Sequence, residues 1–360
     1  FTSDSDTEVI AHLLVNELMR NDLEQAIRET MRKLVGSYSL VILIEDKVIG
    51  VRDPLGFKPL CIGRLENGYV LASESCAIDT LNGELVRDVA PGEMVVLGDR
   101  IESYKLFHSR SRAHCMFEFV YVARPDSIMD GRLIYKVRHR IGEELARECP
   151  TAADIVSPVP DSGITSAIGY AGASGVRYAE GMIKNRYIGR TFIMPGQEER
   201  EKSVRRKLNA IDLEFRGKTV LLVDDSIVRG TTSAQIIELA REAGAAKVYF
   251  ASAAPPVRFP NVYGIDMPAA SELVASGRSV EEISRLIGAD WLVYQDLEDL
   301  IVACKHEDAR IEEFDTSCFS GVYVTGDVTP EYLERLQDER SDAAKLERRA
   351  RRKLKVVRGS

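Results

Sequence analysis

The most restrictive feature of this sequence is an uninterrupted apolar run at 219–223 that stops at two adjacent aspartates and leads into a helical pattern. Short strand-like runs also occur at 154–156 and 247–252, and amphipathic helical patterns at 134–145 and 232–243 alternate with them. Fully apolar strands joined by helices are typical of a parallel sheet that is covered on both faces. The second part of the chain is therefore predicted to be a doubly wound α/β domain.

The first part of the chain follows a different pattern. Ser5-x-x-Glu8 has the form of a capping box that opens an amphipathic helix, and 23–34 predicts a second helix. Short β-rich runs separated by turn residues follow at 38–44, 48–51, 69–72 and 94–97. We expect one antiparallel sheet carrying helices, which ends near residue 106.

These patterns divide the chain into residues 1–110, residues 111–330 and a tail over residues 331–360. The tail turns polar and helical from Pro330, and residues 345–358 hold eight basic residues and one acid. We interpret this basic stretch as a solvated helix or a frayed tail rather than as a nucleic-acid arm.

Composition narrows the range of partners and compartments. The net charge of −8 disfavours a nucleic-acid partner whose affinity comes from phosphate neutralisation. No apolar run approaches the ~18 residues that a bilayer span needs, so no membrane partner is expected. The six cysteines are scattered without a C-x-x-C pair, which predicts a cytoplasmic location.

The segment after the apolar run carries the chemistry. Asp224 and Asp225 come at the carboxyl end of the strand, where open α/β sheets bind ligands, and a short loop leads into the helix. The free N–H groups of that helix start, its dipole and the loop hydroxyls suit a phosphate dianion, with Gly230 letting the backbone approach the ligand. An isolated Asp-Asp-Ser would more simply cap the helix, but the whole segment is far more restrictive. It predicts a sugar phosphate ligand, with magnesium as a second candidate for the acids.

This segment resembles the phosphoribosylpyrophosphate (PRPP) binding motif of the type I phosphoribosyltransferases. In that family the paired acids hold the ribose hydroxyls and the following loop holds the 5-phosphate. The resemblance thus implies catalytic roles for Asp224 and Asp225. It also implies PRPP contacts for Ser226, Ile227, Val228, Arg229, Gly230, Thr231 and Thr232.

A second loop of the same family precedes this motif and grips the diphosphate and magnesium. Val159-Pro-Asp-Ser-Gly163 is similar to it, although Pro-Asp-Ser-Gly alone is a common turn. The resemblance adds PRPP contacts at Pro160, Asp161, Ser162 and Gly163. It also implies that Ser162, Asp224 and Asp225 surround a magnesium ion.

A long polar connection, 184–207, lies between the two motifs and contains eight basic and three acidic residues. Such a connection is ordinarily a mobile solvated loop. Beside a substrate that carries a phosphate and a diphosphate, we interpret it as a closing lid that supplies cations and excludes water. Lys184 and Arg190 are the predicted catalytic cations, and Tyr187 is a predicted PRPP contact.

Three segments of the first part resemble the class II glutamine amidotransferase domain, which has the N-terminal-nucleophile fold. They are Arg52-Asp-Pro-Leu-Gly-Phe-Lys-Pro-Leu60, Ala72-Ser-Glu-Ser75 and Pro91-Gly-Glu93. The opening residues are similar to the segment whose aspartate contacts the amino group of glutamine in that family, and Asp6 is the matching position. Local sequence alone favours helix capping for Asp6.

A class II glutamine amidotransferase domain joined to a type I phosphoribosyltransferase domain is typical of the glutamine phosphoribosylpyrophosphate amidotransferase family. A further segment that resembles this family is Phe119-Val-Tyr-Val-Ala-Arg-Pro-Asp-Ser127. The resemblance covers residues 1 to about 325. It implies the first step of de novo purine synthesis, in which glutamine or ammonia and PRPP give 5-phosphoribosylamine and diphosphate. It also implies magnesium as cofactor, purine nucleotides as inhibitors and ammonia passage inside the protein. We further expect a homo-oligomer.

The chain departs from this family's pattern in two places. The family's N-terminal cysteine nucleophile and its glutamine-binding segments do not occur before Asp6. We therefore expect an N-terminally incomplete chain that uses ammonia but not glutamine. Some members bind a four-cysteine iron–sulfur cluster, and here Cys115 and Cys318 match two ligand positions, whereas Asn261 and Asp315 occupy the others. No iron–sulfur cluster is expected.

Two alternatives share the PRPP motif. A salvage phosphoribosyltransferase would not need residues 38–97 to resemble an amidotransferase sheet. A PRPP-sensing transcription regulator would need a basic DNA-binding module, and the first part contains no recognisable helix-turn-helix in a net acidic chain.

Overall fold

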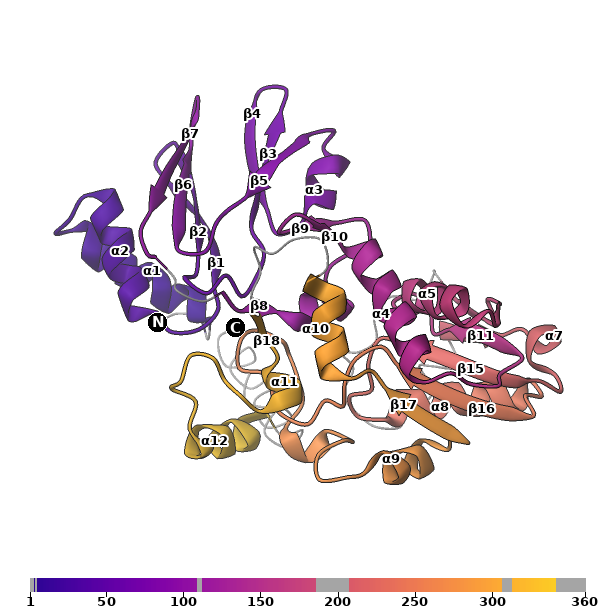
Figure 1. Ribbon diagram of the computed structural model, residues 1–360. Coiled ribbons are helices and arrows are strands. Elements are labelled where there is room, and N and C mark those ends of the chain that lie inside the picture. Colours follow the sequence, from indigo (N-terminus) through magenta and orange to yellow (C-terminus); the bar gives the residue numbers. More distant parts are fainter. Residues whose placement is uncertain (1–2, 4, 109–111, 186–206, 306–312, 341–360) are drawn as a thin grey trace, which may run out of the picture.

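The computed structural model describes residues 3, 5–108, 112–185, 207–305 and 313–340, and it shows two regions of different architecture. Figure 1 places a strand-rich region at the start of the chain beside an α/β region formed by the later residues. The predicted lid residues Tyr187 and Arg190 and the basic stretch 345–358 lie outside the described residues. Within the described part, no helix has the length and apolar character needed to cross a membrane.

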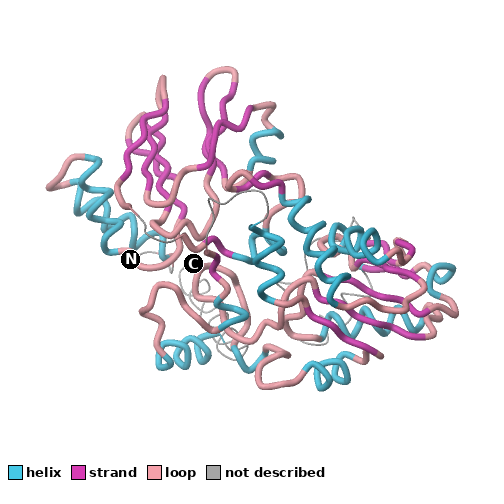
Figure 2. The backbone as a smooth tube through the Cα atoms, in the orientation of Figure 1, coloured by secondary structure: helices cyan, strands magenta, loops and turns pink. Residues whose placement is uncertain are grey.

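The first region contains two antiparallel sheets rather than the single sheet that the sequence predicts (Figure 2). The first sheet has the order β1-β2-β6-β7, and the second has the order β4-β3-β5. The strands are β1 (Ser39–Ile44), β2 (Lys47–Arg52), β3 (Cys61–Leu65), β4 (Gly68–Ala72), β5 (Glu84–Asp88), β6 (Glu93–Leu97) and β7 (Ile101–Lys105). β3 and β5 carry Gly63 and several charged residues, so their sequences do not show the apolar alternation of a strand.

Two helices cover one face of the four-stranded sheet, α1 (Asp6–Leu18) and α2 (Leu23–Lys33). Ile27 and Met31 of α2 pack with Ile49 and Met94 of the strands in one core. The predicted N-cap Ser5 is correct, but the predicted capping box is wrong in detail. The Glu8 carboxylate accepts hydrogen bonds from the N–H and hydroxyl of Ser3 instead of the N–H of Ser5.

The second region is built on a parallel sheet of five strands in the order β12-β11-β15-β16-β17, which confirms the predicted α/β fold. The strands are β11 (Ile155–Pro158), β12 (Arg177–Tyr178), β15 (Thr219–Asp224), β16 (Lys247–Ser252) and β17 (Trp291–Tyr294). Helices α4 (Ile134–Glu148) and α5 (Ile164–Ser174) cover one face, and α8 (Thr231–Glu242) and α9 (Val280–Ile287) cover the other (Figure 1).

Alternation along β15 explains why its sequence is continuously apolar. Val220 and Leu222 belong to the core under α8 and α9, whereas Leu221 and Val223 belong to the core under α4 and α5. A strand buried on both faces needs apolar side chains at every position. The remaining elements are α3 (Ser75–Thr80), β8 (His114–Cys115), a π-helix η1 (Glu118–Val122), β9 (Ile128–Met129), β10 (Arg132–Leu133), β13 (Met182–Lys184), β14 (Leu208–Ala210), α7 (Asp212–Phe215), a 3-10 helix η2 (Ala270–Glu272), α10 (Leu297–Lys305), β18 (Phe314–Asp315), α11 (Ser317–Ser320) and α12 (Pro330–Arg340).

A buried polar junction joins the two regions. Arg52 at the end of β2 is only 1% exposed, and its two terminal nitrogens donate to the Asp130 carboxylate at 2.9 and 3.0 Å. His114 contacts the other side of that carboxylate, with 2.8 Å between Nδ1 and Oδ2. Burial raises the pKa of Asp130, but the charges and hydrogen bonds of Arg52 and His114 outweigh burial and hold it well below its usual range.

Candidate functional site

The candidate site lies at the carboxyl end of β15, where Asp224 and Asp225 follow the last apolar residue. Both residues are buried, at 8% exposure each. β11 pairs with β15 in parallel, with Pro158 opposite Val223, so the loops that follow both strands leave the same edge of the sheet. The two motifs that the sequence singles out are therefore neighbours.

A hydrogen bond joins the two loops directly. The Ser162 hydroxyl donates to Oδ2 of Asp225, and the Ser226 hydroxyl donates to Oδ1 at 2.5 Å. The Asp224 carboxylate accepts the N–H of Asp225 at 2.9 Å. The three predicted magnesium ligands, Ser162, Asp224 and Asp225, thus lie in one group of oxygen atoms.

Burial raises the pKa of both acids. Burial is the larger cause for Asp224, and the neighbouring charge of Asp225 adds to it. Burial also raises the pKa of Asp225, while hydrogen bonds from Ser162 and Ser226 and the charge of Arg138 oppose the shift. A pair of buried carboxylates to which no described cation bonds directly favours the binding of a positively charged partner.

The helix that follows the acid pair starts without a side-chain cap. α8 begins at Thr231, and Gly230 is its N-cap residue, with no side-chain hydrogen bond to the first turn among the described residues. Thr231 is half-buried and Thr232 is exposed, so both hydroxyls lie at the helix start. An uncapped helix start offers free N–H groups and a positive dipole end to an anion.

Gly230 has a conformation and surroundings that a larger residue would not tolerate. Its φ is +77°, a conformation that favours glycine, and an added Cβ would lie 3.1 Å from Val274 and 3.3 Å from Ile287. The glycine is therefore needed for the turn and for packing against the core. The predicted close approach of the backbone to a ligand at Gly230 stays a prediction.

The remaining loop residues differ in what their side chains reach. Ile227 is 1% exposed within the core, and Val228 packs against a second core cluster. The Arg229 guanidinium forms an ion pair with Glu272 at 2.6 Å. For these three predicted PRPP contacts, the backbone rather than the side chain is the part available to a ligand.

The stem of the predicted lid is close to the first loop. Lys184, the last residue of β13, places its Nζ 2.5 Å from Oδ2 of the exposed Asp161. β13 pairs with β14, and the N–H of Asn185 donates to the carbonyl of Lys207 at 2.6 Å. The two ends of the connection 184–207 are thus adjacent, beside the loop that contains Pro160, Ser162 and Gly163.

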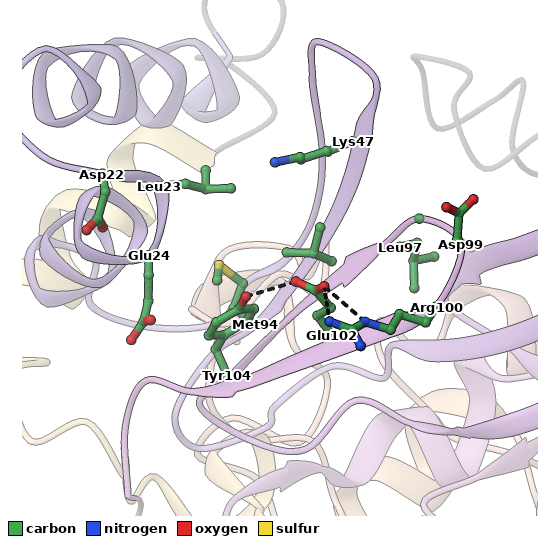
Figure 3. Close-up of a pocket in the computed structure, with 12 residues that line it drawn as sticks. Asp22, Leu23, Glu24, Lys47, Met94, Leu97, Asp99, Arg100, Glu102 and Tyr104 are labelled. Carbon is green, nitrogen blue, oxygen red and sulfur yellow. Dashed lines mark hydrogen bonds and ion pairs between the residues drawn. The ribbon is translucent and has the colours of Figure 1, made fainter.

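Asp6 is the first residue of α1, and Figure 1 shows α1 beside the strand-rich first region, away from β15. It is exposed at the start of α1, and its carboxylate accepts the N–H of Thr7 at 2.8 Å. A cavity of about 640 Å³ occurs in the same region between α2 and strands β6 and β7 (Figure 3). Its lining mixes acids and bases, including a Glu102 carboxylate held by Tyr104 and Arg100, and includes none of the predicted site residues.

The four positions that correspond to cluster ligands in some family members are gathered in the structure. Cys115 pairs with Asp315 across β8 and β18, and the Asn261 amide donates to Sγ of Cys318 at 3.4 Å. Lys58 donates to Sγ of Cys115 at 3.5 Å and to Glu118 at 2.7 Å. Burial raises the pKa of Cys115 to about 11, so this thiol is kept protonated.

Sequence reasoning did not single out Arg138 and Glu74, which hold one backbone segment of the second region. Arg138 is 2% exposed on α4, and its charge acts on Asp225. The available signal was a charged residue beside Val137 on the apolar stripe of a helix. Glu74 lay within the quoted segment 72–75, but only the fold shows that its carboxylate binds the second region, at Arg124 and Ser127.

Comparison with known proteins places these features in a family. Residues 1–80 match a family model described as a glutamine amidotransferase domain. The amidophosphoribosyltransferase of Pseudomonas aeruginosa is 52% identical, over 97% of this chain and 74% of that relative. The amidophosphoribosyltransferase of Archaeoglobus fulgidus is 53% identical, over 86% of this chain and 68% of that relative.

Two solved structures are similar across both regions. One is a glutamine PRPP amidotransferase from B. subtilis complexed with ADP and GMP, with a TM-score of 0.82 and 42% identity over 92% of this chain and 74% of that one. The other is described as the allosteric regulatory enzyme of purine biosynthesis, with a TM-score of 0.84 and 42% identity over 94% of this chain and 73% of that one.

Proposed function

Because the chain belongs to the amidophosphoribosyltransferase family, we propose that the edge of its parallel sheet at Asp224 and Asp225 is the PRPP site of that reaction. Members of the family are pentosyltransferases of purine biosynthesis, and the sequence prediction of this activity is confirmed. The relatives give no support to a salvage phosphoribosyltransferase or to a PRPP-sensing regulator. The observation that carries the site is the hydrogen bond from Ser162 to Asp225, which joins the two predicted motifs.

Each part of the site fits one part of PRPP. The carboxylates of Asp224 and Asp225 accept hydrogen bonds from the ribose hydroxyls. The loop of Ser226, Ile227, Val228, Arg229 and Gly230 presents backbone N–H groups, and the α8 start at Thr231 and Thr232 receives the 5-phosphate. The loop of Pro160, Asp161, Ser162 and Gly163 receives the diphosphate.

The chain's own residues account for the reaction mainly by orientation and charge. Displacement at the ribose C1 develops positive charge on the sugar, and the nearby acid pair stabilises that charge without forming a covalent bond. Lys184 forms an ion pair with Asp161 in this structure. From this position it can exchange that partner for the departing diphosphate and stabilise its negative charge. We propose the same role for Arg190 and a PRPP contact for Tyr187, both beyond the described residues.

Magnesium fits the oxygen atoms of Ser162, Asp224 and Asp225. Burial raises the pKa of both carboxyls, and no described cation bonds to them directly, which supports a cation at this site. Oxygen ligands are those that magnesium prefers. When bound, magnesium neutralises charge on the leaving diphosphate.

The nitrogen donor and regulators follow from the family. We propose that Asp6 holds the amino group of glutamine, and its exposure at the start of α1 keeps the carboxylate accessible. The B. subtilis relative is complexed with ADP and GMP, which supports purine nucleotides as inhibitors of this chain too. Exposed apolar side chains on η1 and α4, at Tyr121, Val122 and Tyr135, support a homo-oligomer.

We retain three further proposals from the sequence. The domains are residues 1–110 and 111–330, with a tail from residue 331, and the last strand of the first region ends at Lys105. The six cysteines are free, which supports a cytoplasmic location. The thiols of Cys115 and Cys318 are held by Lys58 and Asn261, which supports the absence of an iron–sulfur cluster.

One assay tests the proposed site. The purified chain is supplied with PRPP, magnesium and ammonium chloride, and diphosphate release is measured. We expect turnover by the wild-type chain and a loss of about 100-fold or more in kcat/KM for Asp224→Asn and Asp225→Asn. Asp99→Asn, at an exposed turn before β7, is the matched control and should keep wild-type turnover. Turnover of both acid variants within a few-fold of wild type would contradict the site.

A further inference from the structure

Arg138 is a buried cation to which the proposed reaction assigns no role. It lies on the apolar face of α4 at 2% exposure. Its Nε donates to the carbonyl of Phe119 at 2.8 Å, and Nη2 donates to the carbonyl of Ala123 at 2.7 Å. These carbonyls belong to η1 and to the residue that ends it, so the guanidinium fixes the last turn of that helix. A buried charge is expensive and therefore usually has a specific role.

Carboxylates from three separate elements act on this guanidinium. Burial lowers the pKa of Arg138, and the charges of Asp225, Glu74 and Glu118 oppose that shift, together with Cys304. Asp225 is the largest of these opposing charges. Charges of both regions therefore lie within electrostatic range of Arg138, namely Asp225 of the acid pair and Glu74 of the first region.

One peptide group links Arg138 to the first region. The carbonyl of the Ala123–Arg124 peptide accepts from Arg138, and its N–H donates to Oε2 of Glu74 at 2.7 Å. The neighbouring Ser75 hydroxyl accepts the N–H of Ile128 at 2.8 Å. The loop of Glu74 and Ser75 and the helix α4 thus hold the same backbone segment from opposite sides.

The backbone of α4 at Arg138 also supports the diphosphate loop. The Ser166 hydroxyl donates to the carbonyl of Arg138 at 3.1 Å, and Ser166 lies one turn beyond Ser162. α4 and α5 touch backbone to backbone, because a Cβ added at Gly142 would lie 1.9 Å from the carbonyl oxygen of Ser166. A displacement of α4 would therefore move the start of α5 and the Ser162 hydroxyl that binds Asp225.

We propose that Arg138 is a positioning residue that connects Glu74 of the first region to the PRPP site. Its side chain fixes the Ala123–Arg124 peptide that Glu74 also holds. Its carbonyl holds Ser166 of α5, one turn beyond the Ser162 hydroxyl that binds Asp225. The inference rests on the proposed assignment of Asp225 to PRPP. A fixed peptide and a fixed helix start keep the Ser162 hydroxyl and the acid pair in one arrangement during the reaction. The same contacts make the geometry of the acid pair depend on the contact between the two regions.

Substitution of Arg138 with kinetics in ammonia tests the proposal. Arg138→Met removes both the charge and the hydrogen bonds, and we expect kcat/KM for PRPP to fall about 10- to 100-fold, with a higher KM for PRPP and an unchanged KM for ammonia. Arg138→Lys keeps the charge and one hydrogen bond, and it should recover kcat/KM to within about fivefold of wild type. Arg147→Met, at an exposed position of the same helix, is the matched control.

A second pair of variants tests the connection through the peptide. Glu74→Ala removes the acceptor of the Arg124 N–H. It should also raise the KM for PRPP, but by less than Arg138→Met does. The double variant Glu74→Ala/Arg138→Met should be no worse than Arg138→Met alone, because both residues hold one peptide. Fully multiplicative losses would overturn the connection.

Three results are distinguishable. If the wild-type chain does not turn over PRPP, the proposed function fails. If the wild-type chain is active and folded Arg138→Met keeps its KM and kcat for PRPP within twofold while only its melting temperature falls, the residue is structural and the inference is overturned. Should Arg138→Met not fold, the shift of melting temperature that PRPP produces in Glu74→Ala decides between the two roles. We expect a smaller shift than in wild type, and a shift equal to that of wild type overturns the inference.

Discussion

The molecule contains two centres of buried acids, and they are arranged in opposite ways. At the junction of the two regions, Asp130 is bonded to Arg52 and contacts His114, and its pKa lies well below the usual range despite burial. At the edge of the parallel sheet, Asp224 and Asp225 are buried without a directly bonded cation from the described residues, and burial raises the pKa of both. The protein compensates the charge of the first centre and leaves that of the second to other partners.

This difference separates a structural role from a binding role. A buried ion pair that is fully hydrogen-bonded stabilises the fold mainly because breaking it leaves an unpaired charge. A buried pair of like charges lowers stability and is retained where a ligand or cation completes it. The junction therefore holds the regions together, whereas the proposed role of the acid pair is to bind substrate.

Removal of Arg52 should have the largest effect on stability. Arg52→Met leaves the Asp130 carboxylate buried with only His114 beside it, and also removes donors to the carbonyls of Gly56 and Val89. We expect a loss of about 3–5 kcal/mol in the free energy of unfolding, measured by urea denaturation. In Arg52→Met/Asp130→Leu the unpaired charge is absent, so part of the loss should be recovered. A double variant that is less stable than Arg52→Met would contradict the ion-pair explanation.

Asp130→Asn should cost less, about 2–3 kcal/mol at pH 7, because the amide keeps one acceptor for Arg52. The effect should depend on pH. The folded pKa of Asp130 is well below its unfolded value of about 3.9. Its contribution is therefore fully present above that value, declines below it and is lost completely only as the pH falls through the folded pKa. Urea denaturation between pH 3 and 7 should show a constant difference down to about pH 4 and the start of convergence between wild type and variant below it. A constant difference over this range would exclude an ionic contribution.

Sequence patterns predicted the second region more accurately than the first. The strand that ends at Asp224 is recognisable from its sequence because both of its faces are buried. Its pairing with β11 appears only in the structure, since β12 comes between the two strands in the chain. The sequence did not predict that the first region forms two sheets. The reason is that β3 pairs with the distant β5, and neither strand shows an alternation of apolar and polar residues. Pairing between distant strands depends on packing that local patterns do not contain.

The site was predicted for the residues that lie on one motif and missed for those that several elements bring together. Asp224, Asp225 and Ser162 carry their chemistry in local sequence, and the structure gathers them at one edge of the sheet. Arg138 acts through carbonyls of η1, and Glu74 acts through the N–H of Arg124, so neither has a local signal of function. Their roles appear only when the two regions are assembled.

The position of the acid pair depends on close backbone packing of α4 against α5, whereas the junction is held by ion pairs. Glycine variants test this contrast. Gly142→Ala places a Cβ against the backbone of α5, and we expect a loss of about 1–3 kcal/mol and a weaker binding of PRPP. Gly172→Ala on α5 is the matched control, because a Cβ there meets nothing within 4 Å. It should be neutral or stabilising by up to about 1 kcal/mol. Equal stability of the two variants would show that the close approach of α4 and α5 is not required.

Asp225→Asn should give the smallest of these changes in stability, and it should stabilise the protein rather than destabilise it. Removing one of two repelling buried charges should raise the free energy of unfolding by about 1 kcal/mol at pH 7, while the hydroxyls of Ser162 and Ser226 keep one oxygen acceptor. Urea denaturation of Asp225→Asn beside Asp130→Asn makes the comparison, since the same chemical change is expected to stabilise one centre and destabilise the other. A destabilisation of Asp225→Asn as large as that of Asp130→Asn would mean that the protein already compensates the charge at the sheet edge, and the case for a substrate site there would be lost.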